Sequence, residues 1–514
     1  MKFLLVNMPW RANGRTGVRA GSRWPHLKIR EEEDYLPFPF FLAYALSLLK
    51  KNSIDAKGID AIAENMQDYE FLKQVKKEGP HLVFAEVSAP SLKNDLDILR
   101  EIKLEAKCLI AVACPSMELI NDAFLKENEF IDYGLPGEYE LTFLDLAKSL
   151  CAKKTPEKIL GLAGRYKGRV FMNPSRKLES VDNLPWPDRD DFPIYKYHDC
   201  PGSIPMPSVQ MIATRGCPFL CTFCAWPQIV YGGRNYRARD VKDVVDEMEF
   251  LVKKKGFKSV YFDDDTFNIG KERMLKFADE LKNRGWKTPW AFMGRADLVD
   301  EEILVRLRET GLSGVKYGVE SGAQELVDAA KKNLNLRKAA ENIRLTKRFG
   351  IKVHLTFTMG LPGETKETIK KTVDFAIALD PESVQFSIMT PFPGTKLYDD
   401  LKSGGMLVSD KLDEYDGNTK SVIRTNALTS EELTLAQKYA YSRWNEFKVK
   451  KQRYSMQNPT TLFLKCLKEH GLAYTLKHSY AYLKNKDYKK YRPQKKNLNA
   501  TKKRHSYGIK LTQI

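Results

Sequence analysis

The chain has 514 residues, of which 43% are hydrophobic and 29% are charged, a composition typical of a globular protein with several domains. It has no run of 18 apolar residues and no signal-peptide pattern, and its eight cysteines are sparse, so membrane-spanning and disulfide-rich secreted folds are disfavoured. The formal net charge is +18, and nearly all of it falls in residues 448–514, which carry 18 Lys or Arg and two acids. We therefore expect residues 1–447 to be nearly neutral. The sparse cysteines and the lack of a signal-peptide pattern predict a reducing compartment, the cytoplasm.

Residues 1–153 alternate short apolar strands with amphipathic helices. Strands are expected at residues 2–7, 56–60, 82–87 and 109–113, and helices at 38–51, 69–77, 94–105 and 138–153. This alternation predicts an α/β domain with a doubly wound parallel sheet. Ligands of such sheets bind at the carboxyl ends of the strands.

The remaining chain divides into three parts. Residues 154–207 are rich in proline, which indicates a linker that wraps between domains. Residues 208–403 hold six strand–helix units, and this number predicts a partial (β/α)6 barrel. Its strands are expected at 208–214, 259–263, 289–295, 314–319, 352–358 and 383–388, and its helices at 241–255, 271–284, 301–309, 336–349, 366–379 and 396–403. Residues 404–514 are expected to form a helical, basic C-terminal region with a disordered end.

Three of the eight cysteines cluster, and they follow the first barrel strand. Cys217, Cys221 and Cys224 lie within eight residues, in a loop that Gly216 and Pro218 keep from becoming a helix. Three thiolates can ligate three irons of a cubane cluster and leave the fourth iron open for chemistry. A zinc knuckle is the alternative, but it needs four ligands and no fourth Cys or His lies nearby in the sequence.

The spacing C-x3-C-x2-C, with the aromatic Phe223 before the last cysteine, resembles the radical S-adenosylmethionine superfamily. The resemblance implies a [4Fe-4S] cluster on Cys217, Cys221 and Cys224, with S-adenosylmethionine on the open iron. An electron from an external donor would cleave S-adenosylmethionine to methionine and a 5′-deoxyadenosyl radical, which removes a hydrogen atom from the substrate. No general acid or base is assigned.

Four further segments fall at the ends of predicted barrel strands, at residues 261–267, 318–322, 360–365 and 391–395. The resemblance implies that Phe223, Asp264 and Glu320 lie near S-adenosylmethionine. Two alternatives remain: the aspartates at 263–265 could cap a helix, and the glycines and prolines could serve only as turns.

The first domain resembles the cobalamin-binding domain that precedes many such barrels, on residues 5–9, 58–61, 80–88 and 131–140. The resemblance implies cobalamin contacts at Asn7, Ser88, Pro115 and Gly137. Where the family usually has a glycine pair after the fourth strand, this chain has Val-Ala-Cys-Pro-Ser at 112–116, and the histidine motif that supplies a lower ligand is absent. Cobalamin could bind without a side-chain lower ligand, or the domain could be vestigial.

The leading hypothesis is cobalamin-dependent methylation of an unactivated carbon on a lipid-like or other small-molecule substrate. The alternatives are radical cyclisation, ring contraction or rearrangement without methyl transfer, and RNA methylthiotransfer. The last is disfavoured because Cys108, Cys114 and Cys151 are not placed to hold a second cluster. The basic, aromatic tail could contact an anionic membrane surface peripherally, on the inner membrane, or form a simple helical cap; nucleic-acid binding is the less favoured use.

Overall fold

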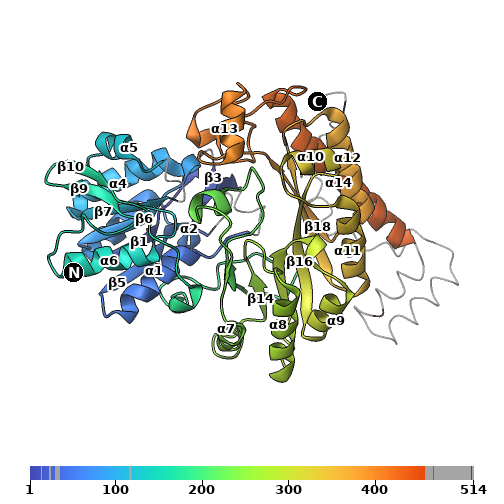
Figure 1. The fold of residues 1–514 in the computed structure, drawn as a ribbon, viewed down its shortest axis with the longest axis horizontal. Helices are drawn as coiled ribbons and strands as arrows, with labels where there is room; N and C mark the ends of the chain where they lie inside the picture. The colour runs from blue at the N-terminus through green and yellow to red at the C-terminus, as the bar shows by residue number, and fades with distance from the viewer. Residues whose placement is uncertain are drawn as a thin grey trace, which may run out of the picture.

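The computed structural model describes residues 1–12, 14–21, 25–28, 35–114 and 119–457, together with Leu467 and Leu511. These residues form two α/β units placed side by side and a long C-terminal helix (Figure 1). A seven-stranded sheet has the order β10-β9-β8-β7-β6-β1-β5, and a six-stranded sheet, the barrel sheet, has the order β11-β14-β15-β16-β17-β18. The expected fold class is confirmed.

The first sheet is buried on both faces, because successive side chains of its central strands point to opposite sides. Phe3 and Leu5 of β1 pack in one apolar cluster, with residues of two covering helices, and Leu4 and Val6 pack in another. The parallel strands are β1 (Phe3–Asn7), β5 (Ala56–Asp60), β6 (Leu82–Glu86), β7 (Leu109–Cys114) and β8 (Tyr133–Pro136). Helices α1 (Phe40–Lys51) and α6 (Glu140–Cys151) cover one face, and α3 (Asp68–Glu78) and α4 (Leu92–Ala106) cover the other.

The strand order reverses at β1. From β1 the chain passes to β5 on one side and then to β6 on the other. A crevice at the carboxyl ends of two strands arises at such a switch point, and it is the usual ligand site of an open α/β sheet. Asn7 ends β1 and Ser88 follows β6, so both residues lie at this crevice.

Seven strands of the described residues were not expected from the sequence: β2, β3, β4, β8, β9, β10 and the two-residue strand β13 (Arg237–Ala238). The antiparallel strands β9 (Ala163–Tyr166) and β10 (Arg169–Met172) extend the first sheet into residues that we expected to be linker. Their two-residue turn has Lys167 at φ 48° and Gly168 at φ 77°, the pattern of a type I′ hairpin. Between β1 and α1 in the sequence, the chain forms a small antiparallel sheet of three strands, β2 (Arg11–Ala12), β3 (Arg15–Val18) and β4 (His26–Lys28).

The proline-rich segment from residue 181 to 207 contacts both units. Asp191 accepts a hydrogen bond from the Gly58 backbone N–H at 2.9 Å, on the first sheet. Trp186 donates its indole N–H to Asp243, on the barrel side, at 2.9 Å. The segment therefore does more than connect the two units.

The end of the same segment closes the floor of the barrel. Ile204 packs against Tyr261 and Ala291, whose strands line the barrel. The backbone passes so close to the sheet that a Cβ added to Gly314 would lie 2.4 Å from the Pro201 carbonyl oxygen. A glycine is required there because of this close approach.

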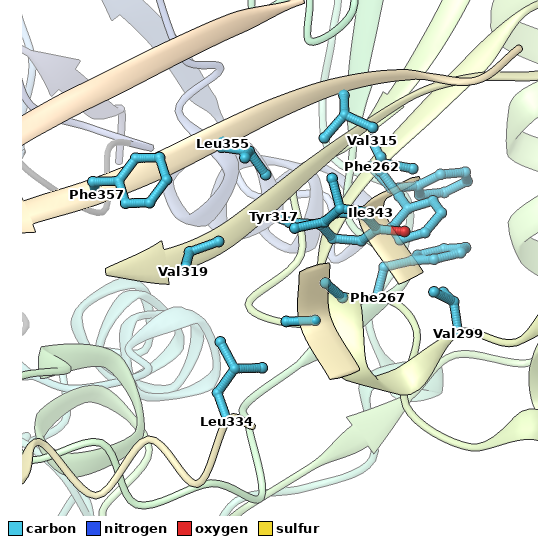
Figure 2. Packing of buried hydrophobic residues seen from close by; sticks show 14 of the residues in the cluster. Phe262, Phe267, Val299, Val315, Tyr317, Val319, Leu334, Ile343, Leu355 and Phe357 are labelled. Carbon is cyan, nitrogen blue, oxygen red and sulfur yellow. The ribbon is translucent and has the colours of Figure 1, made fainter. Parts of the chain in front are cut away.

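The barrel sheet is fully parallel. Side chains on its outer face, such as Phe262, Tyr317 and Phe357, form one apolar cluster with the surrounding helices (Figure 2). The strands are β11 (Ser208–Met211), β14 (Ser259–Phe262), β15 (Trp290–Gly294), β16 (Leu312–Glu320), β17 (Lys352–Met359) and β18 (Ser383–Ile388). The helices around them are α7 (Val241–Lys253), α8 (Lys271–Asn283), α9 (Glu301–Glu309), α11 (Leu336–Arg348) and α12 (Lys366–Leu379). Strands β11 and β18 end the sheet without pairing with each other, so the barrel is open on one side.

Helix α14 (Ser430–Gln457) packs against α12 and β18. Gln437 donates to the Phe386 carbonyl at 2.9 Å, and the Phe386 N–H donates to the Tyr441 hydroxyl at 3.1 Å. The basic tail beyond this helix lies outside the described residues, apart from Leu467 and Leu511. Within the described part of the chain, no helix is both long enough and apolar enough to cross a membrane.

Candidate active site

The cysteine loop, residues 216–224, lies at the barrel mouth, between β12 (Thr214–Arg215) and its antiparallel partner β13 (Arg237–Ala238). Gly216 has φ +84°, and a Cβ there would lie 1.4 Å from the Asn235 carbonyl oxygen. The Gly216 N–H donates to Asp265 at 2.8 Å. The glycine is therefore required both by its backbone conformation and by the space around it.

The three thiols are half-buried and close enough to affect one another. Burial raises the pKa of Cys221 and Cys224, and the neighbouring cysteines raise both further. Lys332 and Arg295 oppose the rise at Cys221. The Cys217 sulfur lies 3.4 Å from the Thr266 hydroxyl. Thiols gathered in this way release their protons when they bind a cation such as iron.

The donor set of the cysteine loop, three thiols, is of the kind that holds a cubane cluster. Among the described residues, no group of three or more His, Cys, Asp or Glu side chains is placed to hold one metal ion. A tetrahedral zinc site requires its ligands to converge on one point, and the part of the chain that the structure describes contains no such set. A cubane cluster takes one thiolate per iron, so its cysteine sulfurs stand apart.

Glu320 ends β16 and reaches the side of the mouth that Cys221 occupies. Its two carboxylate oxygens accept hydrogen bonds from Lys332 Nζ and from the Thr358 hydroxyl, each at 2.9 Å. Lys332 is buried, yet Glu320 and Cys221 raise its pKa above the usual value. Lys332 therefore stays charged beside the cysteine loop. Glu320 has φ +72°, a strained backbone conformation of the kind found at functional sites.

The aspartates after β14 hold the loops of the mouth. Asp264 is fully buried and accepts hydrogen bonds from the Ala213 N–H, at 3.2 Å, and the Thr214 hydroxyl, at 2.5 Å. It does not cap α8, whose N-cap is Gly270. Phe223 packs on the barrel core. The contacts of S-adenosylmethionine with Phe223, Asp264 and Glu320 stay predictions.

Asn7 and Ser88 come together at the switch point of the first sheet. Asn7 donates to Asp60 at 3.0 Å, and Ser88 shares a hydrogen bond of 2.7 Å with Ser91. Gly137 lies elsewhere, where a Cβ would stand 3.2 Å from the Val230 carbonyl of the barrel unit. Pro115 lies outside the described residues. The structure thus brings two of the four predicted cobalamin residues together, and cobalamin contact stays a prediction for all four.

Sequence reasoning missed the buried Arg19, which enters this switch point from the loop after β3. Its guanidinium pairs with Asp95 and donates to the Asn7 side chain, at 3.2 Å, and to the Met8 carbonyl, at 2.7 Å. Burial raises the pKa of Asp95, and Arg19 opposes that rise. No motif marks Arg19, because a long-range contact brings it here.

A small cavity, with room for about one water molecule, lies between the two units, next to the cysteine loop. Phe41 of α1 stacks on Trp226, with ring centroids 5.4 Å apart and planes 23° apart. Trp226 thus packs across the domain interface. The cavity is lined by residues of both units: Gly21, Phe40 and Phe41 from the first, and Ile212, Thr214, Trp226, Tyr231, Asp263 and Asp265 from the second.

The family model of the radical SAM superfamily matches residues 211–376, a range that includes the three cysteines and the whole of strands β14 to β17. The chain carries a radical S-adenosylmethionine domain. The predicted enzyme class is thereby confirmed, with the [4Fe-4S] cluster and S-adenosylmethionine as the cofactors of that class.

Two relatives extend the likeness beyond this domain. An uncharacterised methyltransferase of Pyrococcus horikoshii is 28% identical over 78% of this chain and 86% of its own length. The anaerobic magnesium-protoporphyrin IX monomethyl ester cyclase of Cereibacter sphaeroides is 27% identical over 77% of this chain and 65% of its own length.

Two solved structures share the fold, the first sheet included. The radical S-adenosylmethionine methyltransferase TsrM from Kitasatospora setae, solved with cobalamin and a [4Fe-4S] cluster, has a TM-score of 0.62 at 19% identity over 78% of each chain. The cobalamin-dependent radical enzyme OxsB, solved with aqua-cobalamin and S-adenosylmethionine, has a TM-score of 0.65 at 16% identity over 94% of this chain and 70% of its own.

Proposed function

We propose that the protein is a cobalamin-dependent radical S-adenosylmethionine methyltransferase that acts on an unactivated carbon of a small molecule. The observation that carries this proposal is the place of the cysteine loop beside the first unit: Arg215, two residues before Cys217, pairs with Glu138 and Glu140 of that unit. The relative in Pyrococcus horikoshii, named as a methyltransferase, supports the same reaction class.

Different residues at the barrel mouth would bind the cluster and S-adenosylmethionine. Cys217, Cys221 and Cys224 would hold the cluster, and the Glu320 carboxylate would accept hydrogen bonds from the ammonium group of S-adenosylmethionine. When bound, the cluster supplies the electron that starts radical chemistry, and cobalamin supplies a transferable methyl group. Phe41 and Trp226, which stack across the interface beside the cysteine loop, would exclude water from the reacting groups.

The switch point of the first sheet suits a cobalamin that has no imidazole ligand from the protein. Among the described residues, the side chains that meet there include Asn7, Asp60, Ser88, Arg19 and Asp95, and none of these is a histidine. Hydrogen bonds and one ion pair join them, so much of the polar floor is formed before a ligand arrives. This supports binding without a side-chain lower ligand over a vestigial domain.

The inner face of the barrel favours a substrate with polar groups. Lys316 pairs with Asp199 at 3.0 Å, and His354 shares a hydrogen bond of 2.8 Å with Ser383. Burial lowers the pKa of His354 to about 3, so its ring is neutral. A lipid-like substrate and a peripheral membrane contact rest on the basic tail beyond residue 457, and both stay predictions, as does the external electron donor.

A second candidate is radical cyclisation without methyl transfer. It is favoured by the 27% identity to a magnesium-protoporphyrin ester cyclase. Both reactions would use the same mouth and crevice, so the mass of the product separates them. A gain of one CH₂ unit supports methylation, and an unchanged carbon count supports cyclisation.

The deciding experiment is anaerobic purification and reconstitution with iron, sulfide and hydroxocobalamin. We expect about four irons per chain and a corrinoid absorbance that survives gel filtration. The triple variant Cys217→Ala, Cys221→Ala, Cys224→Ala should lose the iron and keep the corrinoid. A wild-type protein that retains iron but no corrinoid would refute the cobalamin part of the proposal.

A further inference from the structure

The amide side chain of Gln228 forms hydrogen bonds with the backbone of the cysteine loop. Gln228 belongs to the single π-helical turn η3 (Trp226–Val230) that follows the loop. Its Nε2 lies 3.1 Å from the Cys221 carbonyl oxygen, 3.1 Å from that of Thr222 and 2.8 Å from that of Cys224. An amide NH₂ has two hydrogens, so the three carbonyls share them.

The other end of the same side chain reaches the far edge of the barrel. Gln228 Oε1 accepts a hydrogen bond of 2.8 Å from the backbone N–H of Lys396, the first residue of α13 (Lys396–Ser403). The Leu397 N–H donates in parallel to the Thr222 carbonyl at 3.0 Å. Helix α13 follows β18, whereas the cysteine loop follows β11. These bonds therefore span the open side of the barrel at its mouth.

We propose that Gln228 is a positioning residue that fixes the backbone of the cysteine loop for cluster binding and joins it to the start of α13. Gln228 acts through the carbonyls of two cysteine ligands and touches no reacting atom. The inference rests on the cluster that the radical S-adenosylmethionine domain implies. Without the amide donor, the Cys224 carbonyl would lose the hydrogen bond from Gln228, and the Cys221 and Thr222 carbonyls would each keep one backbone N–H donor only. The thiolates would then no longer be held in one arrangement.

Gln228→Glu is the sharpest change, because it keeps the shape of the side chain and removes the donor. A carboxylate can still accept from Lys396, but it faces three carbonyl oxygens that it cannot bind. We expect the reconstituted variant to release iron to an anaerobic chelator about tenfold faster than the wild type or more, since an unmet buried hydrogen bond costs about 1–3 kcal/mol. The electron paramagnetic resonance spectrum of the reduced cluster should also change in shape.

Lys396→Pro tests the other end of the amide. Proline is well tolerated at the first position of a helix, and the preceding Thr395 has ψ 147°, which suits a residue before proline. The change removes one N–H and leaves the Leu397 bond. We expect a smaller, few-fold acceleration of iron release, which disappears when Gln228 is already replaced by Leu. Lys396→Ala keeps the N–H and is the matched control, with release at the wild-type rate.

The proposal is overturned if Gln228→Glu holds its iron as long as the wild type does, or if Lys396→Pro and Lys396→Ala behave alike. Should Gln228→Glu fail to fold, the two Lys396 variants decide the question alone. A wild-type protein that binds no iron would instead refute the cluster itself.

Discussion

Gly216 stands directly before the first cysteine and carries the tightest backbone contact of the mouth. We expect Gly216→Ala to abolish cluster assembly, because the added Cβ would overlap the Asn235 carbonyl and the residue would keep a positive φ. Iron content after reconstitution measures this. Gly232→Ala is the matched control, since Gly232 has φ +61° with no atom within 4 Å of an added Cβ. Equal iron content in the two variants would contradict the prediction.

Glu320 is the residue for which a cofactor role can be measured directly. Glu320→Gln keeps the size of the side chain and removes its negative charge, so a cationic ammonium group binds less tightly. We expect the dissociation constant for S-adenosylmethionine to rise about tenfold, because a hydrogen bond to a charged group contributes about 1.5–3 kcal/mol. Equilibrium dialysis with the reconstituted protein measures it, and iron content should not change.

The control for that measurement is Glu325→Gln, on α10 (Gln324–Ala329), where the carboxylate pairs with Lys371 on the exposed surface. It should leave the dissociation constant as it is. A Glu320→Gln protein that binds S-adenosylmethionine as tightly as the wild type would show that Glu320 serves only the protein interior, through Lys332 and Thr358.

The residues that sequence reasoning finds are those with a local signature. The spacing of Cys217, Cys221 and Cys224 within one loop is enough to predict their role. Gln228 and Arg19 do not, because their partners lie far along the chain, and only the fold brings Lys396 to one and Asp95 to the other. The sequence places Asp264 after a barrel strand, but its bonds to Ala213 and Thr214 depend on the fold, and its contact with S-adenosylmethionine stays a prediction.

The turn after β17 contains a buried carboxyl that makes a pH-dependent contribution to stability. Burial raises the pKa of Glu364 to about 7, although Thr368 and the Gly360 N–H donate to it. An unfolded glutamate ionises near pH 4.5. The folded protein therefore holds a proton that the unfolded chain loses, and this contribution to stability falls as pH rises from about 4.5 to 7.

Glu364→Gln removes that titration. Between about pH 5 and pH 8 the wild type should lose up to about 3 kcal/mol of stability relative to the variant. Thermal unfolding of both proteins at the two pH values measures the difference. Glu367→Gln, on the exposed surface of the next helix, should track the wild type. A wild type and Glu364→Gln protein whose melting temperatures shift in parallel would contradict the raised pKa.

At the scale of elements, regular patterns were predicted well and short strands were not. Strand β18 and helices α9, α12 and α13 have the bounds expected from the sequence, because apolar periodicity and capping residues mark both ends. Strands β9 and β10 were missed since four residues carry too little periodicity and prolines surround them. The reach of the first sheet to Met172 follows from pairing with β8, which is a tertiary effect.

The two units are joined by a buried ion cluster next to the cysteine loop. Arg215 of the barrel unit lies 2.7 Å from Glu140 and 3.3 Å from Glu138 of the first unit, and it stacks on Phe41. Burial lowers the pKa of Arg215, but Glu140 and Glu138 raise it by more, so the net shift is upward and the guanidinium stays charged. Removal of one partner leaves a buried charge uncompensated, which is costly.

We expect Glu140→Ala to destabilise the protein by about 3 kcal/mol and to speed proteolysis between the two units. The double variant Arg215→Met, Glu140→Leu should be less destabilised than the single one, because no charge is stranded at that site. Asp97→Ala, which breaks an exposed pair with Arg100, should change little. A Glu140→Ala protein as stable as Asp97→Ala would show that the cluster does not join the units.

The segment from residue 181 to 207 sets a limit on how this chain can be divided. Its residues bind the first sheet at Gly58 and complete the barrel floor at Ile204, so neither core is whole without it. A fragment that begins at Ser208 would expose Tyr261 and Ala291 at the bottom of the barrel and should aggregate. Exchange of the first unit for that of a relative should succeed only when the cut falls before this segment and its contact residues are carried over with it.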